Sequence, residues 1–463
     1  MDPRSFDVLI IGGGQAGIPL ARALAGKGQR VALAERKHLG GSCVNFGCTP
    51  TKAAIASARL AQMARRGAEF GIELPEPKID FAAVLERARS IALKSRASLD
   101  ERMQSSDNPA LLRGHIRFEG RDRGGFRLRL ADEKFVAGIV VLDTGTRSMI
   151  PPIDGIEDID FLHASNWLDK PQRPQRLVMV GGSYIGLEMA QFYRRMGSEV
   201  VVVESVDQIM EREDSDIATT LQRLLQAEGI AFRLSSQVKR VSSAGGRLLV
   251  QIDSAQEGLV EASHVFIATG RKPNTDELGL EAVGVELSEK GIVTTNERLA
   301  TTVEGIYAAG DIRGGPMFTH TSWDDYRVLE SQLAGDGSRT TDRVVPYAVF
   351  TDPALGRVGM TEKEAQQAGR RVKVGSFEMS NNGKAAEIGE SGGVIKVVID
   401  ADDDRLLGAA VLAHEGGELV HTLIDLMNAR APCSVVRDAV YIHPTLAEAV
   451  QSAVSAAAQP QTD

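Results

Sequence analysis

Cysteine is scarce in this chain, with only three among 463 residues. A small secreted scaffold held together by several disulfides is therefore excluded, because such scaffolds depend on dense cysteine pairing. Long apolar runs are also missing, and none approaches the roughly 18 residues that a membrane-spanning helix needs. The N-terminal sequence MDPRSFDVLIIGGG passes from a short apolar run directly to glycines, which predicts a strand and not a signal peptide.

Basic residues do not outnumber acidic ones: 53 Lys and Arg stand against 62 Asp and Glu, a net charge of −9. An acidic balance disfavours nucleic acids and anionic membranes as partners, and no basic cluster in the sequence counters it. We therefore expect no nucleic-acid partner and no membrane partner. The missing signal peptide and spanning helix lead us to expect a cytoplasmic protein. The length predicts about three domains.

The N-terminal region contains a strand, a glycine turn and a helix. The apolar run 8–11 predicts a strand buried on both faces, and Gly12, Gly14 and Gly17 then form the pattern G-x-G-x-x-G. In this pattern the first glycine makes the tight turn, the second lets a pyrophosphate approach the backbone, and the third lets helix and strand pack closely. Glu35 ends the next predicted strand, where an acid accepts hydrogen bonds from ribose hydroxyls.

The same unit recurs in the middle of the chain. Gly181, Ser183 and Gly186 repeat the glycine pattern, and Glu204 takes the place of Glu35. The first glycine and the acid are separated by 23 residues in both units, from 12 to 35 and from 181 to 204. The alternative is two ordinary parallel-sheet units without ligands, but those would not need matched acids. Serine is small enough for the second position, so the sequence predicts two dinucleotide sites.

Cys43 and Cys48 lie just after the first unit, in GGSCVNFGCTPTK. A structural disulfide across so short a loop would stabilise the fold by only about 2 kcal/mol in the chain-entropy model. A zinc site needs about four ligands, and only Cys433 remains, which we interpret as a buried core cysteine. A redox-active pair needs a lowered thiol pKa, which a helix N-terminus or a cation such as Lys52 can provide. The neighbouring dinucleotide pattern favours this third role.

Five segments follow one another over almost the whole chain: GGSCVNFGCTPTK, GGSYIGLE, ATGRKPNT, AAGD and HPTLAE. Together with the glycine pattern they resemble the pyridine nucleotide–disulfide oxidoreductases, which include dihydrolipoamide dehydrogenase, glutathione reductase and mercuric reductase. The resemblance implies that the first unit binds FAD and the second a nicotinamide nucleotide. Electrons would pass from NAD(P)H to the flavin, then to a Cys43–Cys48 disulfide, and then to the substrate.

The resemblance also implies roles for individual residues. Cys48 corresponds to the thiolate that lies against the flavin, and Cys43 to the cysteine that exchanges with the substrate. Lys52 corresponds to the lysine near flavin N5, Glu188 to its carboxylate partner, and Tyr184 to the aromatic residue that gates the nicotinamide pocket. Further candidate cofactor-binding positions are Ser42, His115, Gly145, Gly270 and Asp311.

The segment HPTLAE supplies a candidate acid–base group. Histidine is the side chain suited to proton transfer at neutral pH, as thiol exchange requires, so His443 is the candidate, and Glu448 would orient its ring. In the family this histidine serves the active site of the other subunit, so the resemblance implies a homodimer. The alternative for a single histidine is a structural role.

The expected fold class is α/β, with two Rossmann-like dinucleotide-binding domains and a C-terminal α+β dimerisation domain. The final residues, SAAAQPQTD, are expected to be disordered. The expected boundaries are 1–150 for the FAD-binding domain, 151–270 for the NAD(H)-binding domain, 271–342 for a central part that completes the FAD domain, and 343–463 for the dimerisation domain.

The nucleotide and the substrate are predicted from finer features. Glu204 favours NAD(H) over NADP(H), because a carboxylate repels a 2′-phosphate, and no arginine follows until Arg212. The predicted preference for NADH and the C-terminal HPTLAE segment together favour a dihydrolipoamide dehydrogenase-like enzyme acting on a lipoyl-type or other disulfide. The alternative is a mercuric-reductase-like enzyme that reduces a metal ion or small oxidant, although the vicinal cysteine pair of that branch is missing from the C-terminus. No resident metal is expected. A non-enzymatic alternative is a flavin-bound redox sensor.

Overall fold

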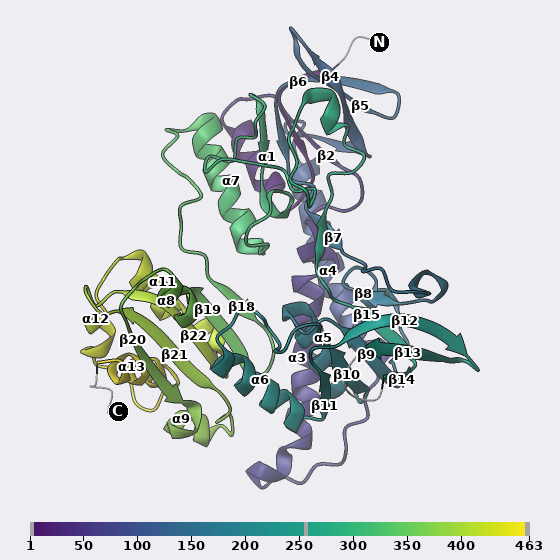
Figure 1. Cartoon of the computed structure of the whole chain (residues 1–463). Coiled ribbons are helices and arrows are strands. Elements are labelled where there is room, and N and C mark those ends of the chain that lie inside the picture. The colour runs from purple at the N-terminus through teal and green to yellow at the C-terminus, as the bar shows by residue number, and fades with distance from the viewer. Residues whose placement is uncertain (1–3, 254–257, 459–463) are drawn as a thin grey trace.

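The computed structural model describes residues 4–253 and 258–458, and it contains three units that are each built on a β-sheet (Figure 1). The first unit lies at the top of the view near the N-terminus, the second at the lower right, and the third at the lower left with the C-terminus. Two long helices run from the first unit down between the other two. The α/β fold class expected from the sequence is confirmed.

The first sheet has a parallel centre made from continuous apolar runs. β1 (Arg4–Ile11) pairs in parallel with β2 (Val31–Glu35) on one side and with β6 (Glu133–Leu142) on the other. Its Leu9 and Ile10 are fully buried, as in a strand covered on both faces. The other elements of this unit are β3 (Ala110–Arg113), β4 (Ile116–Asp122), β5 (Gly125–Leu130), α1 (Gly17–Gly26), α7 (Thr319–Ala334) and η4 (Leu280–Val283).

A strand from much later in the chain completes this sheet. β17 (Ile306–Ala308) pairs in parallel with β6, and α7 packs on α1. A small two-stranded sheet of β7 (Thr146–Ser148) and β16 (Arg271–Pro273) links the same two parts of the chain. Residues on both sides of the second unit therefore belong to one structural body.

The second unit repeats the parallel arrangement, with strand order β11-β10-β9-β15-β8. Its core is formed by runs such as EVVVV in β10, against which the strongly buried helix α5 packs. The elements are β8 (Leu162–His163), β9 (Arg176–Val180), β10 (Glu199–Val203), β11 (Ile230–Arg233), β15 (His264–Ile267), α5 (Tyr184–Arg195), α6 (Ser215–Ala227), η2 (Ile156–Asp158) and η3 (Trp167–Asp169), with an antiparallel attachment of β12 (Gln237–Ala244), β13 (Arg247–Asp253) and β14 (Leu259–Ala262).

The C-terminal unit is an antiparallel sheet with strand order β18-β19-β22-β21-β20, and its helices pack around the sheet. The expected disorder of the final residues is wrong at its start. Ser455 and Ala456 belong to α13 (Ala447–Ala456), and Ala457 is buried in the core. Residues 459–463 lie outside the described residues. The other elements are β18 (Tyr347–Val349), β19 (Ala354–Gly359), β20 (Val372–Glu378), β21 (Val394–Asp400), β22 (Leu406–Ala413), α8 (Glu362–Gln367), α9 (Gly383–Glu387), α10 (Gly416–Leu419), α11 (His421–Asn428), α12 (Ser434–Arg437) and η6 (Met379–Asn381).

The two long helices are α3 (Cys48–Arg65) and α4 (Phe81–Gln104), which lie after the short α2 (Gly41–Asn45), with η1 (Gly67–Phe70) between them. Their small and aromatic residues, including Ala54, Ala58 and Phe81, are buried against the second unit. The helix that begins at Cys48 therefore packs on the second unit, and α2 joins it to the first. This arrangement places the cysteines at the junction of the units.

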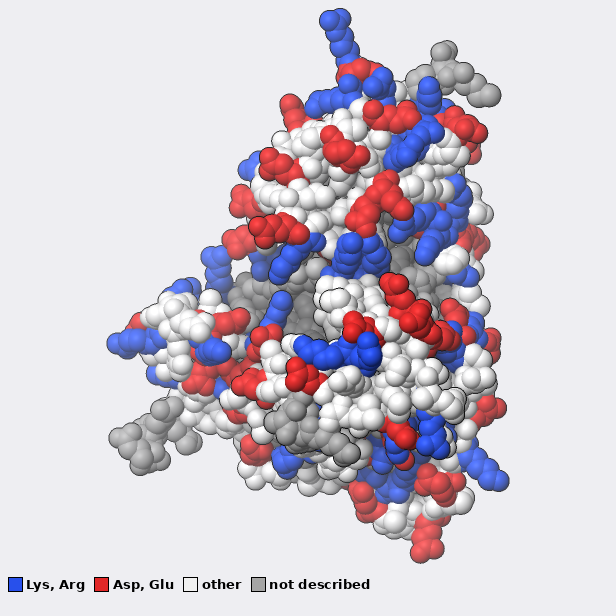
Figure 2. Space-filling model, turned by 45° about the vertical axis from the view of Figure 1, so that its right-hand side comes forward, with Lys and Arg blue, Asp and Glu red and all other residues white. Residues whose placement is uncertain are grey.

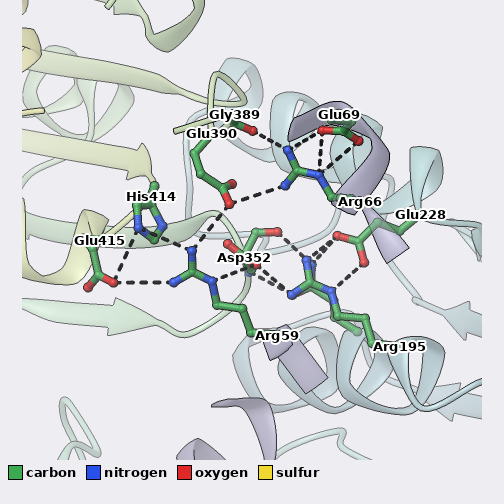
Figure 3. Close-up of polar contacts among 11 residues, drawn as sticks. Arg59, Arg66, Glu69, Arg195, Glu228, Asp352, Gly389, Glu390, His414 and Glu415 are labelled. Atoms are coloured by element: carbon green, nitrogen blue, oxygen red, sulfur yellow. Dashed lines mark hydrogen bonds and ion pairs between the residues drawn. The ribbon is translucent and has the colours of Figure 1, made fainter. Parts of the chain in front are cut away.

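Ion pairs fasten the C-terminal unit to α3 and α5 (Figure 3). Arg195 on α5 is almost fully buried and bonds both Glu228, at 2.7 and 2.8 Å, and Asp352, at 2.7 Å. Arg59 on α3 contacts Asp352, Glu390 and His414. The carboxylate oxygens and ring nitrogen of these three residues lie within 4.8 Å of one another, close enough to be considered as a metal site. The guanidinium of Arg59 supplies a positive charge beside these three groups, so we interpret the cluster as an ion-pair network.

The surface carries both signs of charge. Lys and Arg side chains are interspersed with Asp and Glu over the face drawn in Figure 2. In the part of the chain that the structure describes, every helix is too short or too polar to cross a lipid bilayer.

The network yields a stability prediction. Arg195→Met should lower the stability of the fold by about 3–5 kcal/mol, because it leaves two carboxylates without their buried partner. Arg176→Met is the matched control: Arg176 pairs with Glu199 on an exposed surface, so its loss should cost less than about 1 kcal/mol. Thermal unfolding midpoints of the two variants check this. Equal midpoints would show that the network contributes nothing specific.

Candidate redox site

The two glycine turns have the same backbone geometry. Gly12 has φ +113° and Gly181 has φ +109°, values that side chains rarely adopt. A Cβ on Gly12 would lie 2.1 Å from the carbonyl oxygen of Asp143, and one on Gly181 would lie 2.5 Å from that of Ala268. The third glycines, Gly17 and Gly186, approach the first ones equally closely. Both turns therefore require glycine, for the reasons that the sequence pattern predicts.

The acid of each unit bonds the middle of its own turn. Glu35 Oε2 accepts a hydrogen bond from the Gly13 N–H at 2.8 Å, and Glu204 Oε2 accepts one from the Gly182 N–H at 2.7 Å. Both carboxylates stand at the carboxyl ends of parallel strands, where dinucleotides bind in folds of this type. Ser183 is the residue before the first turn of α5 and has extended backbone geometry.

The cysteines lie on two consecutive helices beside the first glycine turn. Cys43 is in α2, and Cys48 is the first residue of α3, where the helix dipole favours a negative charge. The segment is bonded to the glycine turn, because the Gly40 N–H donates to the Gly13 carbonyl at 2.7 Å. Both thiols are free, with Cys43 half-buried and Cys48 exposed.

The two thiols have opposite pKa shifts. A hydrogen bond from Cys43, with smaller contributions from Thr319 and Lys52, lowers the pKa of Cys48 to about 6. The Thr319 hydroxyl lies 3.3 Å from the Cys48 sulfur. The same sulfur–sulfur hydrogen bond, together with burial, raises the pKa of Cys43. At neutral pH Cys48 is therefore the thiolate and Cys43 the protonated thiol.

Lys52 joins the cysteine helix to the second unit. Its ammonium lies 2.6 Å from Glu188 Oε2 on α5, and the Glu188 side chain is almost fully buried. The other oxygen, Oε1, accepts a hydrogen bond from the backbone N–H of Phe350 at 2.9 Å. The Phe350 ring also lies 4.4 Å from the ammonium, in cation–π geometry. The pair is therefore held by three segments that are far apart in sequence.

Tyr184 stands at the start of α5 in an aromatic cluster. Its ring lies 5.4 Å from that of Tyr347 and 6.3 Å from that of Phe318. The Tyr347 hydroxyl donates to Glu213, which forms a buried ion pair with Arg357 at 2.9 Å. Burial raises the pKa of Tyr184, so its hydroxyl stays protonated at neutral pH. Tyr184 is thus supported on one side by aromatic rings and a buried charge pair.

The remaining cofactor candidates occupy the first unit and the link to the second. Asp311 accepts a hydrogen bond from Thr146 at 2.8 Å, and Arg271 lies 3.6 Å from it. His115 bonds the Glu277 carbonyl at 2.9 Å. Ser42 is in α2 beside Cys43, and Gly145 and Gly270 have positive φ angles in the turns after β6 and β15.

His443 and Glu448 form a bonded pair in the C-terminal unit. His443 Nδ1 lies 3.0 Å from Glu448 Oε1, and Glu448 Oε2 accepts the Thr445 N–H at 2.7 Å. The His443 side chain is 78% exposed. The pair adjoins α13, which lies away from α3 and its cysteines in a single chain (Figure 1).

Three residues at this site were not singled out from the sequence. Asp143 bonds the first glycine turn, Thr319 contacts Cys48, and Phe350 contacts the Lys52–Glu188 pair. Asp143 could have been found by aligning VVLDTGTR with VFIATGRK, where the second unit has Ala268. Thr319 and Phe350 reach the site through tertiary packing, which no local pattern marks.

The first turn fits FAD. Its positive-φ glycine, its helix N-terminus and the acid at the end of the next strand form a cradle that a Cβ would fill. The cysteine segment lies close to this cradle, because a Cβ on Gly41 would be 3.3 Å from Gly14 Cα. The second turn forms the same cradle, so the chain has two sites that fit a dinucleotide.

Comparisons with known proteins agree with this geometry. The sequence model of the pyridine nucleotide-disulphide oxidoreductases matches residues 6–325, and that of their dimerisation domain matches residues 345–454. The probable pyridine nucleotide-disulfide oxidoreductase RclA of Escherichia coli (strain K12) is 32% identical over 460 residues, covering 97% of this chain and 99% of that protein. The dihydrolipoyl dehydrogenase of Thermus scotoductus is 32% identical over 458 residues, covering 98% and 97%.

A solved structure has the same fold. The Cu(II) complex of the HOCl-induced flavoprotein disulfide reductase RclA from Escherichia coli gives a TM-score of 0.88 at 30% identity, covering 98% of this chain and 99% of that chain.

The thiol geometry yields a prediction for two single-cysteine variants. In Cys43→Ser the hydroxyl still donates to Cys48, so the thiolate should form with a pKa near 6. In Cys43→Ala the largest stabilising contact is lost, and the pKa should rise by at least about one unit. The rate of iodoacetamide alkylation of Cys48 against pH measures both. Identical profiles would assign the low pKa to the helix N-terminus and Lys52 instead.

Proposed function

This chain belongs to the pyridine nucleotide–disulphide oxidoreductase family, and we propose that it is an NADH-dependent FAD enzyme acting on a disulfide of the lipoyl type. The observation that carries the proposal is the position of the cysteine segment. It is bonded to the first glycine turn, and Lys52, one helical turn after Cys48, is paired with Glu188 on the helix of the second turn. The redox pair therefore lies between the two candidate dinucleotide sites.

FAD, when bound, accepts a hydride from the nicotinamide and passes two electrons to a disulfide. We assign it to residues 1–150 together with 271–342, and the nicotinamide nucleotide to 151–270. Glu204 supports NADH over NADPH, because its carboxylate would face a 2′-phosphate. Tyr184 and the Lys52–Glu188 pair would line the nicotinamide side.

The chain's own residues supply the thiol chemistry. Cys48 holds the negative charge, while the raised pKa of Cys43 keeps that thiol protonated until a base removes its proton. His443 is the proposed base, oriented by Glu448. Since that pair belongs to the C-terminal unit, which matches the family's dimerisation domain, we propose a homodimer through residues 343–463 in which each subunit lends its histidine to the other.

A second candidate function is reduction of a metal ion such as Cu(II). RclA has been solved as a Cu(II) complex, and this chain is as similar to RclA as to dihydrolipoyl dehydrogenase. An exposed low-pKa thiolate is a suitable soft ligand for copper. In this function the metal ion is the substrate.

One assay separates the two functions. With NADH, the holoenzyme should turn over lipoamide, and Cys48→Ser should lose at least about a thousandfold in kcat because the pair can no longer form a disulfide. NADPH should support a lower kcat/KM than NADH. Cys433→Ser is the matched control, since Cys433 is buried in the C-terminal core.

Cu(II)-dependent NADH oxidation should be measured in parallel with the same variants. Copper turnover without lipoamide turnover would establish the metal reductase. Lipoamide turnover that survives Cys48→Ser would contradict the disulfide enzyme, and copper turnover that survives it would contradict the metal reductase.

A further inference from the structure

A carboxylate is buried directly beneath the first glycine turn. Asp143 follows β6, and its Oδ2 accepts hydrogen bonds from the N–H of Gly17, at 2.7 Å, and of Gly14, at 3.1 Å. Gly17 is the first residue of α1, so the carboxylate lies at the N-terminus of that helix. The residue is 7% exposed. A buried acid in this place has no role in the function proposed above.

The second unit provides an internal comparison. Ala268 occupies the same position there: its N–H donates to the Val180 carbonyl at 2.8 Å, as that of Asp143 donates to Ile11 at 2.8 Å. A Cβ on Gly17 would lie 2.9 Å from Asp143 Oδ2, and a Cβ on Gly186 would lie 3.6 Å from the Ala268 methyl. The glycine turn therefore forms without a carboxylate, and Asp143 is specific to the first site.

The charges around Asp143 are mainly negative. Asp311 on η5 (Gly310–Arg313) and Asp325 on α7 both raise its pKa, and Glu35 stands at the other side of the turn. Asp311 and Asp325 are themselves paired with cations: Arg271 with Asp311, and Arg313 and Arg343 with Asp325.

Burial has the largest effect on Asp143 and raises its pKa well above the ordinary value, while the two backbone N–H groups lower it. Two helix N–H donors do not offset the loss of water around the charge. The carboxyl group therefore exchanges its proton in a pH range higher than an exposed aspartate would.

We propose that Asp143 is a cofactor-positioning residue that couples FAD binding to the uptake of one proton. The proposal rests on the assignment of FAD to the first glycine turn. A dinucleotide pyrophosphate binds at the N-terminus of the helix that follows such a turn, which here is α1. That negative charge would lie at the helix end where the Asp143 carboxylate already accepts two N–H groups, and like charges favour the protonated acid. As a neutral carboxyl group, Asp143 still accepts the Gly17 N–H and holds the turn in place.

The direction of the pH dependence follows from this. FAD binding raises the pKa of Asp143 above its value in the free protein, so affinity is greatest below the free-protein pKa. As the pH rises from that value to the pKa of the complex, the dissociation constant should increase by about tenfold per pH unit. Above the pKa of the complex the loss is complete.

Calorimetric titration of the flavin-free full-length chain with FAD measures the coupling. At each pH between about 5 and 9, the binding enthalpy in two buffers of different ionisation enthalpy gives the number of protons taken up. The native chain should show a maximum approaching one proton. Asp143→Asn keeps an acceptor for the Gly17 N–H and should take up none, with a dissociation constant independent of pH. Asp122→Asn, an exposed acid of the same sheet, should behave as the native chain.

Zero proton uptake by the native chain at every pH would overturn the inference, and this result does not depend on whether the variant folds. Uptake that persists unchanged in a folded Asp143→Asn would also overturn it, by assigning the proton elsewhere. A native chain that binds no FAD would instead contradict the proposed function. FAD binding that is independent of pH leaves that function intact and removes only the role of Asp143.

Discussion

The Lys52–Glu188 ion pair is the interaction on which the site depends. It joins α3, which begins at Cys48, to α5, which begins at the second glycine turn, and the backbone of Phe350 brings the C-terminal unit to the same carboxylate. Glu188 is almost fully buried, so its charge is tolerated only because a cation and an N–H face it. Movement of any of the three units would expose or unpair this carboxylate. The pair thus fixes the distance between the cysteine helix and the helix that follows the second glycine turn.

The protonation states of the two cysteines also depend on the groups that contact them. Cys48 becomes the thiolate because Cys43, Thr319, Lys52 and the start of α3 all favour a negative charge there. Cys43 remains protonated for the complementary reason, since a second thiolate would face the first. A further base is then needed to activate Cys43. His443 is the candidate, and its exposed position in the single chain is what a residue serving a partner subunit requires.

Much of this could be predicted from sequence, because local rules determine it. A positive φ angle and a close backbone approach require glycine at 12 and 181, and the end of a parallel strand places an acid at 35 and 204. A C-terminal α+β domain was also expected, although the order in which its strands pair was not. Tertiary contacts were not predictable in this way. Phe350 reaches Glu188 across 162 residues, and Arg195 reaches Asp352 across 157. Asp143 could be predicted only in part. Comparing the sequences of the two units shows that it is unusual, but the structure is needed to show which N–H groups it accepts.

In the proposed function, two electrons from NADH come to rest on Cys43 and Cys48. Anaerobic rapid mixing of the oxidised holoenzyme with one equivalent of NADH tests it most directly, with flavin absorbance and free thiols followed together. We expect the flavin absorbance to recover, a long-wavelength band from the Cys48 thiolate to appear beside it, and two new thiols to form in each chain. Flavin that stays reduced, with no new thiols, would show that the electrons do not reach the cysteines.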